Sequence, residues 1–497
     1  MQKNNDRSFW FWLGSLAFMA GVVVYWVSAP YGLGLAADSI ACLQAAKHFL
    51  LGYGIAFFDE AGKLAPMGHF PPVFPVVLSA AWFLGLSFFE WARLLNAFFF
   101  AGSIFLAGSI VFYVRGSRFS ALAAALVLMA SVPVLKAYGM LGAEALFVCI
   151  LLGWFWLLLL FVDTGRRCTL YGAACCAGFA ALTDYSGLAV IMAGGAWLWF
   201  KGRADGRVRD ALLFLSASLV LPLVWFVRNA VLTGSLMGGK IDGILRFSDR
   251  IAIAVNSCSE WLLPSRVPLA LRWIVLAAAL VLVLKWLKGR CRDFSLEVKR
   301  AKLLAIVFGG IYFFSGLSGL IPMYGGAALD HKALVPVYVI LLLGIGFIVP
   351  KATLCRKTTV VLLSCFLMLA LARSMNWAVL SYKNGCGYSS KVLGSSKLAE
   401  TLRSIDDRVP LYSNDPAAVY YFTGRPAARI PAGGEKKAGI LSMKVVMDDF
   451  SRRRAVAVVF SAVPFHPAGE WERAAALAGL EPLFKDGAGD IWGVRKK

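Results

Sequence analysis

Long apolar runs recur along most of the chain, and they limit the folds that are open to it. A transmembrane α-helix needs about 20 consecutive apolar residues, and many runs near that length cannot share one soluble core. Runs that span a membrane, or nearly so, lie at residues 9–29, 92–114, 119–137, 145–162, 169–183, 186–200, 210–229, 267–286, 303–321, 333–350 and 357–379. The pattern predicts a polytopic α-helical membrane protein with about eleven transmembrane helices.

Composition and charge support a membrane protein. Hydrophobic residues make up 59% of the chain, charged residues 16%, and the mean hydropathy is +0.71. The net charge of +22 could suit a nucleic-acid partner, but no basic stripe with interleaved aromatic residues occurs in a polar region. The first run follows Lys3 and Arg7 and is longer than a signal-peptide core, which predicts an uncleaved first span. We therefore expect a multi-pass protein of the cell (inner) membrane that contacts membrane lipid and no nucleic acid.

The distribution of basic residues predicts the orientation. Loops next to transmembrane helices carry more Lys and Arg on the cytoplasmic side. If the apolar run 72–88 does not span, the basic loops, including the dense KWLKGRCRDFSLEVKRAK, all fall on the side of the N-terminus. If it spans, all of them are exported. The rule thus predicts a cytoplasmic N-terminus, a first external loop at residues 30–91, and an extracytoplasmic C-terminal region.

The stretch GHFPPVFPVV at residues 68–77 is the unusual part of that loop. Proline lacks a backbone donor and fixes its own φ, so Pro71 and Pro72 favour a short helix that starts just after them. Irregular backbone at membrane depth is tolerated where it packs against protein or lines a cavity. We expect a cavity here with His69 at its mouth. His69 as a simple interfacial residue is an equally weighted alternative.

The last segment, residues 380–497, has a different character. Its charge rises, and RVPLYSND, AVAVVFSA and EPLFKDGAGDIWGV have the pattern of short strands between helical stretches such as EWERAAALAGL. This predicts a small C-terminal α/β domain after a transmembrane domain at residues 1–379. Asp415 in YSNDP is expected to cap a helix over PAAVYYF. No catalytic cluster is evident, so the domain should support folding or acceptor binding without supplying a base.

Several charged residues fall on the predicted external side. Asp38 heads a stretch whose apolar residues recur at helical spacing, and its ordinary role would be an N-cap. Glu144 would likewise be a first-turn carboxylate. Arg228 in PLVWFVRN and the run Asp330, His331, Lys332 could be interface anchors. Taken singly, none of these residues indicates a function.

Taken together, these residues resemble a known superfamily. The chain is similar to the GT-C integral membrane glycosyltransferases, in particular bacterial relatives of protein O-mannosyltransferases and aminoarabinose transferases. The resemblance covers nearly the whole chain and rests on Asp38, AAKHFLLGYG, HFPPVFPVVLSAAWFLG, AEALF with Glu144, LTDYSGLA, WFVRN, DHKALVP and VPLYSNDPAAVYYFTGRPA. It implies a cell-envelope transferase that uses a polyprenyl-phosphate sugar donor and an extracytoplasmic lipid, glycan or protein acceptor.

The resemblance also implies roles for the residues. Phosphate is already a competent leaving group, so an inverting hexosyl or pentosyl transfer needs mainly a base for the acceptor hydroxyl. Asp38 would be that catalytic base, and Glu144 would orient the acceptor or support Asp38. Fixed cations would stabilise the charge that develops on the donor phosphate. The candidates for donor-phosphate binding are His69, Arg228, His331 and Lys332.

Two other classes of protein remain open. Carboxylates and broken helices also mark transporters of lipid-linked or small polar substrates, although those usually show paired repeats, which this chain lacks. A non-catalytic scaffold whose external domain binds a glycan is the other class. The ten cysteines show no zinc spacing. No cofactor or metal site is predicted, but a divalent metal is left open, as are the sugar, the acceptor, the oligomeric state and pairing of Cys258 with Cys386.

Overall fold

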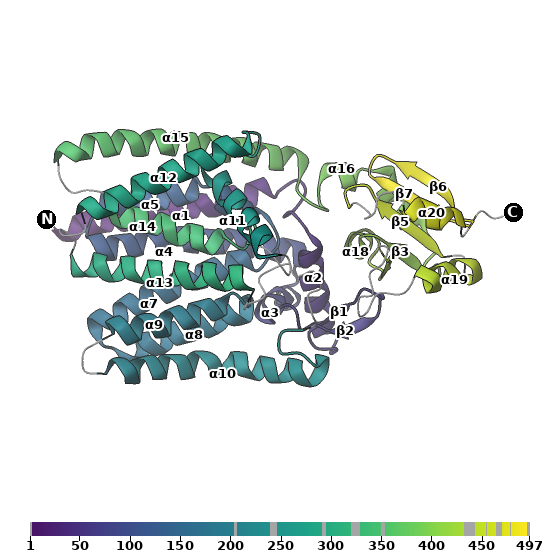
Figure 1. Ribbon diagram of the computed structural model, residues 1–497, viewed down its shortest axis with the longest axis horizontal. Helices are drawn as coiled ribbons and strands as arrows, with labels where there is room; N and C mark the ends of the chain where they lie inside the picture. The colour runs from purple at the N-terminus through teal and green to yellow at the C-terminus, as the bar shows by residue number, and fades with distance from the viewer. Residues whose placement is uncertain are drawn as a thin grey trace. The chain divides into compact units, whose positions relative to one another are not determined.

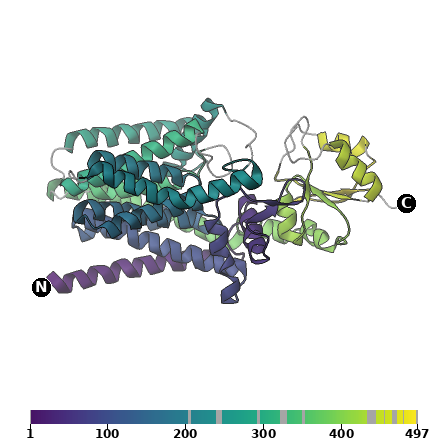
Figure 2. The same ribbon diagram turned by 90° about the horizontal axis from the view of Figure 1, so that it is seen from below.

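The computed structural model of the chain is mainly helical (Figures 1 and 2). It describes residues 2–202, 206–238, 246–290, 295–319, 329–348, 353–431, 443–453, 455–463, 470–477 and 479–494. The longer helices are α1 (Gln2–Val27), α2 (Ala37–Leu50), α4 (Phe88–Arg115), α5 (Arg118–Met129), α7 (Glu144–Thr164), α8 (Arg167–Thr183), α9 (Gly187–Lys201), α10 (Arg207–Thr233), α11 (Phe247–Leu262), α12 (Leu269–Arg290), α13 (Leu296–Ser318), α14 (Val335–Ile348), α15 (Thr353–Asn384) and α19 (Met443–Arg453). The shorter ones are α3 (Val73–Ser79), α6 (Val132–Gly139), α16 (Lys391–Gly394), α17 (Lys397–Ser404), α18 (Pro416–Thr423) and α20 (Glu470–Leu477).

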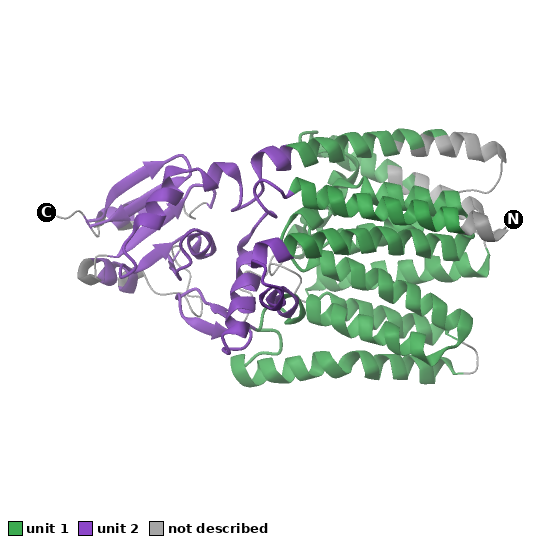
Figure 3. Cartoon of the chain, turned by 180° about the vertical axis from the view of Figure 1, so that it is seen from behind, with its two compact units in different colours: residues 1–27, 68–74, 92–379 green, residues 28–67, 75–91, 380–497 purple. Residues whose placement is uncertain are grey.

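The chain divides into two compact units, coloured separately in Figure 3. Unit 1 comprises residues 1–27, 68–74 and 92–379, and unit 2 comprises residues 28–67, 75–91 and 380–497. The sequence analysis had assigned the whole loop 30–91 to the transmembrane domain. In the structure, most of that loop belongs to the unit that contains the C-terminal segment.

Unit 1 is a bundle of apolar helices. A helix occupies each of the predicted apolar runs. Among the described residues, α1, α4, α7, α10 and α13 are long and apolar enough to cross a membrane, and α5 with α6 makes a sixth if that pair, bent by 57°, is one span. The helices α9 and α14 are apolar but shorter, so the predicted total of about eleven spans stays a prediction.

Small residues let the helices of unit 1 approach one another closely. Helix α10 packs against both α8 and α9. A Cβ on Gly178 of α8 would lie 2.8 Å from the Ser218 carbonyl oxygen, and one on Gly194 of α9 would lie 2.5 Å from the Phe214 ring. Glycine at these positions allows backbone contact that a larger side chain would prevent, as is common between membrane helices.

The apolar run 72–88 forms two short helical pieces. Helix α3 begins right after Pro71 and Pro72, and a single 3-10 turn, η1 (Trp82–Leu84), follows it before Gly85 ends the turn with a left-handed conformation. Even as one continuous α-helix, residues 73–84 would reach only about 18 Å, and the hydrocarbon core is about 30 Å thick. Trp91 donates a hydrogen bond from Nε1 to the Val77 carbonyl, 2.9 Å away, which fixes α3 to the start of α4.

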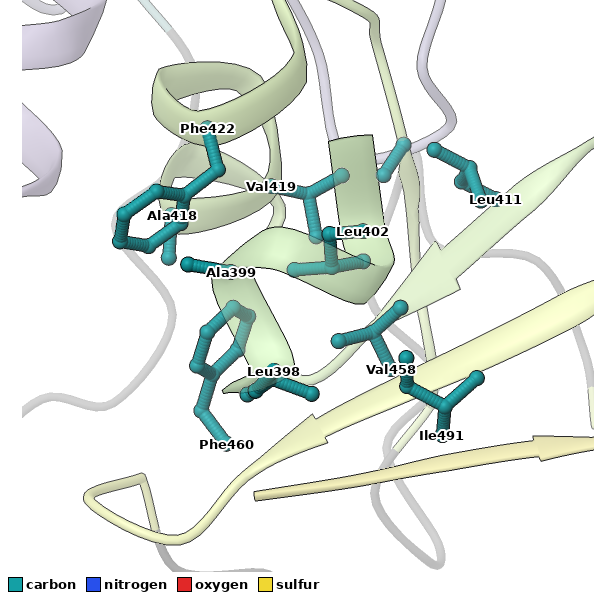
Figure 4. Close-up of a cluster of buried hydrophobic side chains, with 11 residues drawn as sticks. Leu398, Ala399, Leu402, Leu411, Ala418, Val419, Phe422, Val458, Phe460 and Ile491 are labelled. Carbon is teal, nitrogen blue, oxygen red and sulfur yellow. The ribbon is translucent and has the colours of Figure 1, made fainter. Parts of the chain in front are cut away.

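Unit 2 contains the strands. Strands β1 (Ala56–Phe58) and β2 (Leu64–Pro66) form an antiparallel hairpin. Strands β3 (Leu411–Ser413), β4 (Ala428–Arg429), β5 (Val456–Phe460), β6 (Glu481–Asp486) and β7 (Gly489–Gly493) form a sheet of order β4-β3-β5-β7-β6. Helices α17 and α18 bury an apolar cluster against this sheet around Leu398, Val419 and Phe460 (Figure 4). Strands therefore occur in each of the stretches where the sequence pattern predicts them.

The first loop and the C-terminal segment are joined by specific contacts within unit 2. The Arg429 amide donates to the Glu60 carbonyl at 2.7 Å, and the two side chains form an ion pair at 3.1 Å. The rings of Phe58 and Tyr420 lie 5.9 Å apart, and α2 packs against α18. These contacts link residues far apart in sequence, which a pattern of local periodicity does not predict.

Candidate functional site

The residues predicted to carry function fall in both units. Asp38 lies on α2 in unit 2, whereas His69, Glu144, Arg228, His331 and Lys332 lie in unit 1.

A network of buried side chains holds the Gly68 carbonyl. The Tyr185 hydroxyl donates to that oxygen at 2.5 Å and accepts hydrogen bonds from Trp225 Nε1 at 3.0 Å and Asn229 Nδ2 at 3.2 Å. Asn229 Nδ2 also reaches the Leu236 carbonyl at 3.1 Å. Burial raises the pKa of Tyr185 to about 12, so its hydroxyl keeps the proton that it donates. The segment before α3 is thus fixed by α10 and by the α8–α9 connection.

Arg228 belongs to the same network. Its guanidinium donates to Asn229 Oδ1 at 2.9 Å and lies 4.6 Å from the centre of the Trp225 ring, a cation–π contact. Because Asn229 Nδ2 also lies 3.4 Å from the Gly68 carbonyl oxygen, Arg228 and the backbone just before His69 belong to one polar network. His69 and Arg228 were both predicted as cations. The motifs LTDYSGLA and WFVRN contain Tyr185 and Asn229, but the contacts of these two residues with the segment before α3 were not predicted.

His69 is partly buried next to Phe70, with ring centres 4.5 Å apart. Burial lowers the pKa of His69 from 6.5 to about 4, so the imidazole is neutral at pH 7. A neutral imidazole still carries one N–H that can donate a hydrogen bond. The charged form that the sequence analysis expected beside an anion stays a prediction.

The backbone of Gly68 and His69 packs closely against Gly238, in the segment after α10. Gly238 has φ +68°, and a Cβ placed on it would lie 2.3 Å from the Gly68 carbonyl carbon and 2.4 Å from the His69 amide nitrogen. Only glycine fits this conformation and this approach without a shift of the backbone. The segment after α10 therefore packs directly on the peptide bond that carries His69.

Glu144 is the first residue of α7 and is buried. A carboxylate in the first turn interacts favourably with the helix dipole, as the sequence analysis noted. Glu144 also acts electrostatically on Tyr312, together with Asp184 and Asp330. The Tyr312 hydroxyl donates to the Ala333 carbonyl at 2.7 Å, which links this acidic group to the turn before α14.

No metal centre is recognisable in the parts of the chain that the structure describes. There, no group of three or more His, Cys, Asp or Glu residues lies close enough to hold a metal ion. Cys258 and Cys386 are both free thiols.

His331 already has an acidic partner. Its Nε2 lies 3.1 Å from Glu260 Oε2, and Arg272 Nη1 lies 3.2 Å from Glu260 Oε1. Half of the His331 side chain remains exposed. Glu260 sits near the end of α11 and was missed from the sequence, where a single acid in an amphipathic helix gives no signal. The amide nitrogen of the neighbouring Lys332 donates to Asp330 Oδ1 at 3.0 Å, which shapes the turn before α14.

Asp38 is not the N-cap of α2, so that expectation from the sequence is wrong. The N-cap is Ala36, and Ser39 Oγ accepts a hydrogen bond from the Ala36 amide at 3.0 Å. Because Ser39 satisfies that amide, the helix starts at Ala37 and Asp38 lies within the first turn.

The Tyr388 amide donates to the Leu35 carbonyl at 3.0 Å, which places the Tyr388 backbone beside the segment that precedes α2. The Tyr388 hydroxyl donates to Asp415, 2.7 Å from Oδ2 and 2.9 Å from Oδ1. Burial raises the pKa of Tyr388 well above its usual value, and the negative charges of Asp415 and then Asp38 raise it further, while Arg429 opposes them. Asp415 also accepts from the Ala418 amide at 3.2 Å, which confirms its predicted role as the cap of α18. No sequence pattern singled out Tyr388.

Comparison with known proteins identifies the fold. No protein-family model matches the chain, and no curated protein sequence matches it. Among solved structures, ArnT from Cupriavidus metallidurans bound to undecaprenyl phosphate is similar over 96% of this chain and 97% of that chain, with a TM-score of 0.61 and 14% identity.

Two further structures share the fold. The archaeal oligosaccharyltransferase AglB from Archaeoglobus fulgidus, in complex with an inhibitory peptide and a dolichol-phosphate, matches 90% of this chain and 69% of its own at 11% identity and a TM-score of 0.53. The arabinofuranosyltransferase AftD from Mycobacteria matches 98% of this chain and 42% of its own at 14% identity and a TM-score of 0.55. The chain has the fold of these three structures, which agrees with the GT-C resemblance of its sequence.

Proposed function

We propose that the protein is a membrane glycosyltransferase that moves a sugar from a polyprenyl-phosphate donor to an extracytoplasmic acceptor. The observation that carries this proposal is the end-to-end similarity in fold to ArnT, whose structure holds undecaprenyl phosphate. AglB, with bound dolichol-phosphate, supports the same class of donor. The acceptor would be a lipid, a glycan or a protein of the cell envelope.

In the proposed reaction Asp38 acts as general base. Its carboxylate takes the proton of the acceptor hydroxyl while that oxygen attacks the anomeric carbon on the face opposite the phosphate. The bond between the anomeric carbon and the phosphate oxygen breaks, and its electron pair leaves with the polyprenyl phosphate. The anomeric configuration is inverted. One carboxylate is enough, because a phosphate leaves without protonation by a dedicated acid.

Cations of unit 1 would receive the departing phosphate. Arg228 is the best supported, because Trp225 and Asn229 fix its guanidinium and a preorganised cation stabilises developing charge most. His69 would donate a hydrogen bond, and Lys332 would add a charge. His331 is less available, since Glu260 already pairs with it. Glu144 would orient the acceptor or support Asp38, and its burial suits a fixed carboxylate.

The cellular setting follows from the charge pattern of the sequence. In this proposal the protein is a multi-pass protein of the inner membrane with a cytoplasmic N-terminus and an extracytoplasmic C-terminal domain. The donor lipid would then reach the protein from the bilayer. The apolar helices of unit 1 support a location in the membrane.

Replacement of Asp38 tests the proposal directly. Asp38→Asn keeps the size of the side chain and removes its basicity, so transfer from radiolabelled undecaprenyl-phosphate sugars to membrane acceptors should fall by about 100-fold or more. Asp407→Asn is the matched control, because Asp407 is an almost fully exposed carboxylate of the same unit, and it should stay within twofold of the native protein. Full activity of Asp38→Asn would reject the base assignment. Movement of the sugar lipid across vesicles without transfer would instead support a transporter.

A further inference from the structure

Three consecutive apolar residues are exposed between α3 and α4 in unit 2. The side chains of Trp82, Phe83 and Leu84, which form η1, are 73%, 81% and 54% exposed. The sequence has no Asp, Glu, Lys or Arg between Lys63 and Glu90, so this stretch carries no charge that would favour contact with water. Runs of exposed apolar side chains usually mark a surface that binds another apolar phase or molecule. We call the three residues of η1 the apolar tip.

The apolar tip is part of a folded turn. Just before it, Leu78, Ser79 and Ala81 are buried. The Ala81 carbonyl accepts hydrogen bonds from the amides of Leu84 and Leu86, both at 3.1 Å. The backbone of the turn is therefore closed on itself while its side chains point away from the buried residues. Exposure of the tip follows from this fold.

The first turn of α4 fixes the position of the apolar tip along that helix. Trp91 Nε1 donates to the Val77 carbonyl at 2.9 Å, which ties α3 to α4. Ser87 Oγ accepts from the Glu90 amide at 3.1 Å and donates to Glu90 Oε2 at 2.9 Å, which closes the start of α4. Helix α4 is long and apolar enough to cross a membrane. The tip therefore stays at the level where α4 begins.

Contacts within unit 1 indicate where the membrane boundary crosses α4. The Arg93 guanidinium donates to the Tyr25 carbonyl at 3.2 Å and lies 4.4 Å from the centre of the Tyr25 ring. Tyr25 and Trp26, at the end of α1, are exposed. Exposed Tyr and Trp beside an arginine are typical of the membrane–water interface. Phe98, about 8 Å further along α4, is 70% exposed and suits contact with lipid. The boundary thus lies near Arg93, close to the start of α4.

We propose that the apolar tip is a lipid anchor, in which Trp82 and Phe83 insert between the headgroups and upper acyl chains of the leaflet where α4 begins. The partner is bilayer phospholipid. Continuity with α4 favours lipid, because the helix with the lipid-facing side chains starts four residues after the tip. An indole suits this boundary, since its ring is apolar and its N–H can reach a headgroup.

This anchor would hold the non-spanning part of the first loop against the bilayer surface. Apolar side chains on a short helix bind a membrane by entering the boundary between headgroups and acyl chains. The inference rests on the location of unit 1 in a membrane. It is independent of the proposed base and of the sugar donor, and its test uses no transfer activity.

The test measures the depth of the apolar tip in vesicles of phosphatidylethanolamine and phosphatidylglycerol. A fluorescent amino acid replaces Phe83 in the full-length protein, and the vesicles contain lipids with a doxyl quencher either next to the headgroup or at the end of the acyl chain. The shallow quencher should reduce emission about twofold or more beyond the deep one. The same label at Phe98 should give a lower ratio of shallow to deep quenching, because that position lies deeper.

A label in place of Leu483 is the matched control for an exposed apolar side chain. Leu483 is 50% exposed on strand β6 of the same unit, and neither quencher should affect it. Circular dichroism of each labelled protein checks folding, and a label in place of Trp82 carries the same test if the one at Phe83 prevents folding.

Three outcomes would overturn the proposal. Emission at residue 83 that neither lipid quenches would place the apolar tip in water. Stronger quenching by the deep lipid would mean that residues 72–88 enter the bilayer core. Energy transfer between labelled copies, without quenching by lipid, would make a second copy of this chain the occupant of the surface.

Discussion

For His69, the sequence and the structure suggest opposite charge states of the imidazole. An imidazole next to a phosphate should be charged, yet its partly buried position lowers the pKa to about 4. The two statements concern different states of the protein. Without an anion, desolvation favours the neutral ring, and a bound phosphate would favour the charged one. A lipid-linked donor could therefore bind together with a proton.

The lowered pKa of His69 predicts a pH dependence of stability. In the unfolded chain His69 has a pKa near 6.5, so the unfolded state takes up a proton first as the pH falls. The stability that comes from the neutral ring is complete above pH 6.5 and is lost between pH 6.5 and about 4, amounting to at most about 3 kcal/mol. Unfolding midpoints of the native protein should fall more steeply over this range than those of His69→Gln. Parallel curves would contradict the buried, neutral imidazole.

His69 also offers a test of donor use. His69→Ala should raise the KM for the undecaprenyl-phosphate sugar about 10-fold, because a hydrogen bond to the phosphate is lost. His69→Lys should recover part of that loss, because a cation is restored. Melting temperatures of both variants at pH 7.5 serve as the control for folding. Near-native donor kinetics in both would leave the segment with a purely architectural role.

The Tyr185 hydroxyl should contribute measurably to stability. Tyr185→Phe removes the donor to the buried Gly68 carbonyl and the acceptor for Trp225 and Asn229. Unsatisfied buried polar groups cost about 1–3 kcal/mol each, so the variant should be destabilised by about 2 kcal/mol. Tyr171→Phe is the control, because Tyr171 is 48% exposed, and it should change stability by less than about 0.5 kcal/mol. Denaturation followed by tryptophan fluorescence would measure both.

At the scale of elements, the hydrogen-bonded pairing of residues 386–389 with residues 33–35 can be tested through its glycine. Gly387→Ala places a Cβ 1.9 Å from the Leu35 carbonyl oxygen at a positive φ, so the two segments must separate. We expect a loss of about 2 kcal/mol or more. Gly394→Ala, in α16, meets nothing within 4 Å and should be neutral or slightly stabilising. Equal melting temperatures for the two variants would show that the pairing is not needed.

The elements also show what the sequence could and could not predict. Apolar length predicted where the helices lie, and alternation predicted strands β3, β5, β6 and β7, because these signals are local. The hairpin of β1 and β2 was missed, since its short strands alternate little. The joining of Glu60 to Arg429 was missed because it links residues far apart in the chain.

The candidate site shows the same limit. Asp38, Glu144, His69 and Arg228 could be chosen from the sequence because charged residues between apolar runs are conspicuous. The contacts of Tyr185, Asn229 and Tyr388 could not be predicted, since each joins residues far apart in the chain. The pairing of His331 with Glu260 was missed because it joins α11 to the turn before α14, far apart in the chain. The charged residues are visible in the local sequence, whereas the residues that contact them are visible only in the fold.

At the scale of the whole molecule, the match to ArnT spans nearly all of both chains at only 14% identity. Such a fold can persist while the side chains of the site change, so fold alone does not define a substrate. The sugar and the acceptor must therefore be found by experiment. Mass analysis of surface glycans in a strain that lacks the protein would identify the missing product.

The topology of the whole chain gives the last prediction. A reporter that is active only outside the cytoplasm, fused after residue 90, should be active, and one fused after Arg118 should be inactive, because the basic loops are expected to stay inside. Fusion after Lys497 should be active, and fusion after Lys201 should be inactive as an internal control. Helix α3, seven residues long, supports this arrangement, since it is too short to cross the bilayer. An inactive reporter at residue 90 would mean that residues 72–88 span the membrane, and it would place Glu144 on the cytoplasmic side, away from any external acceptor.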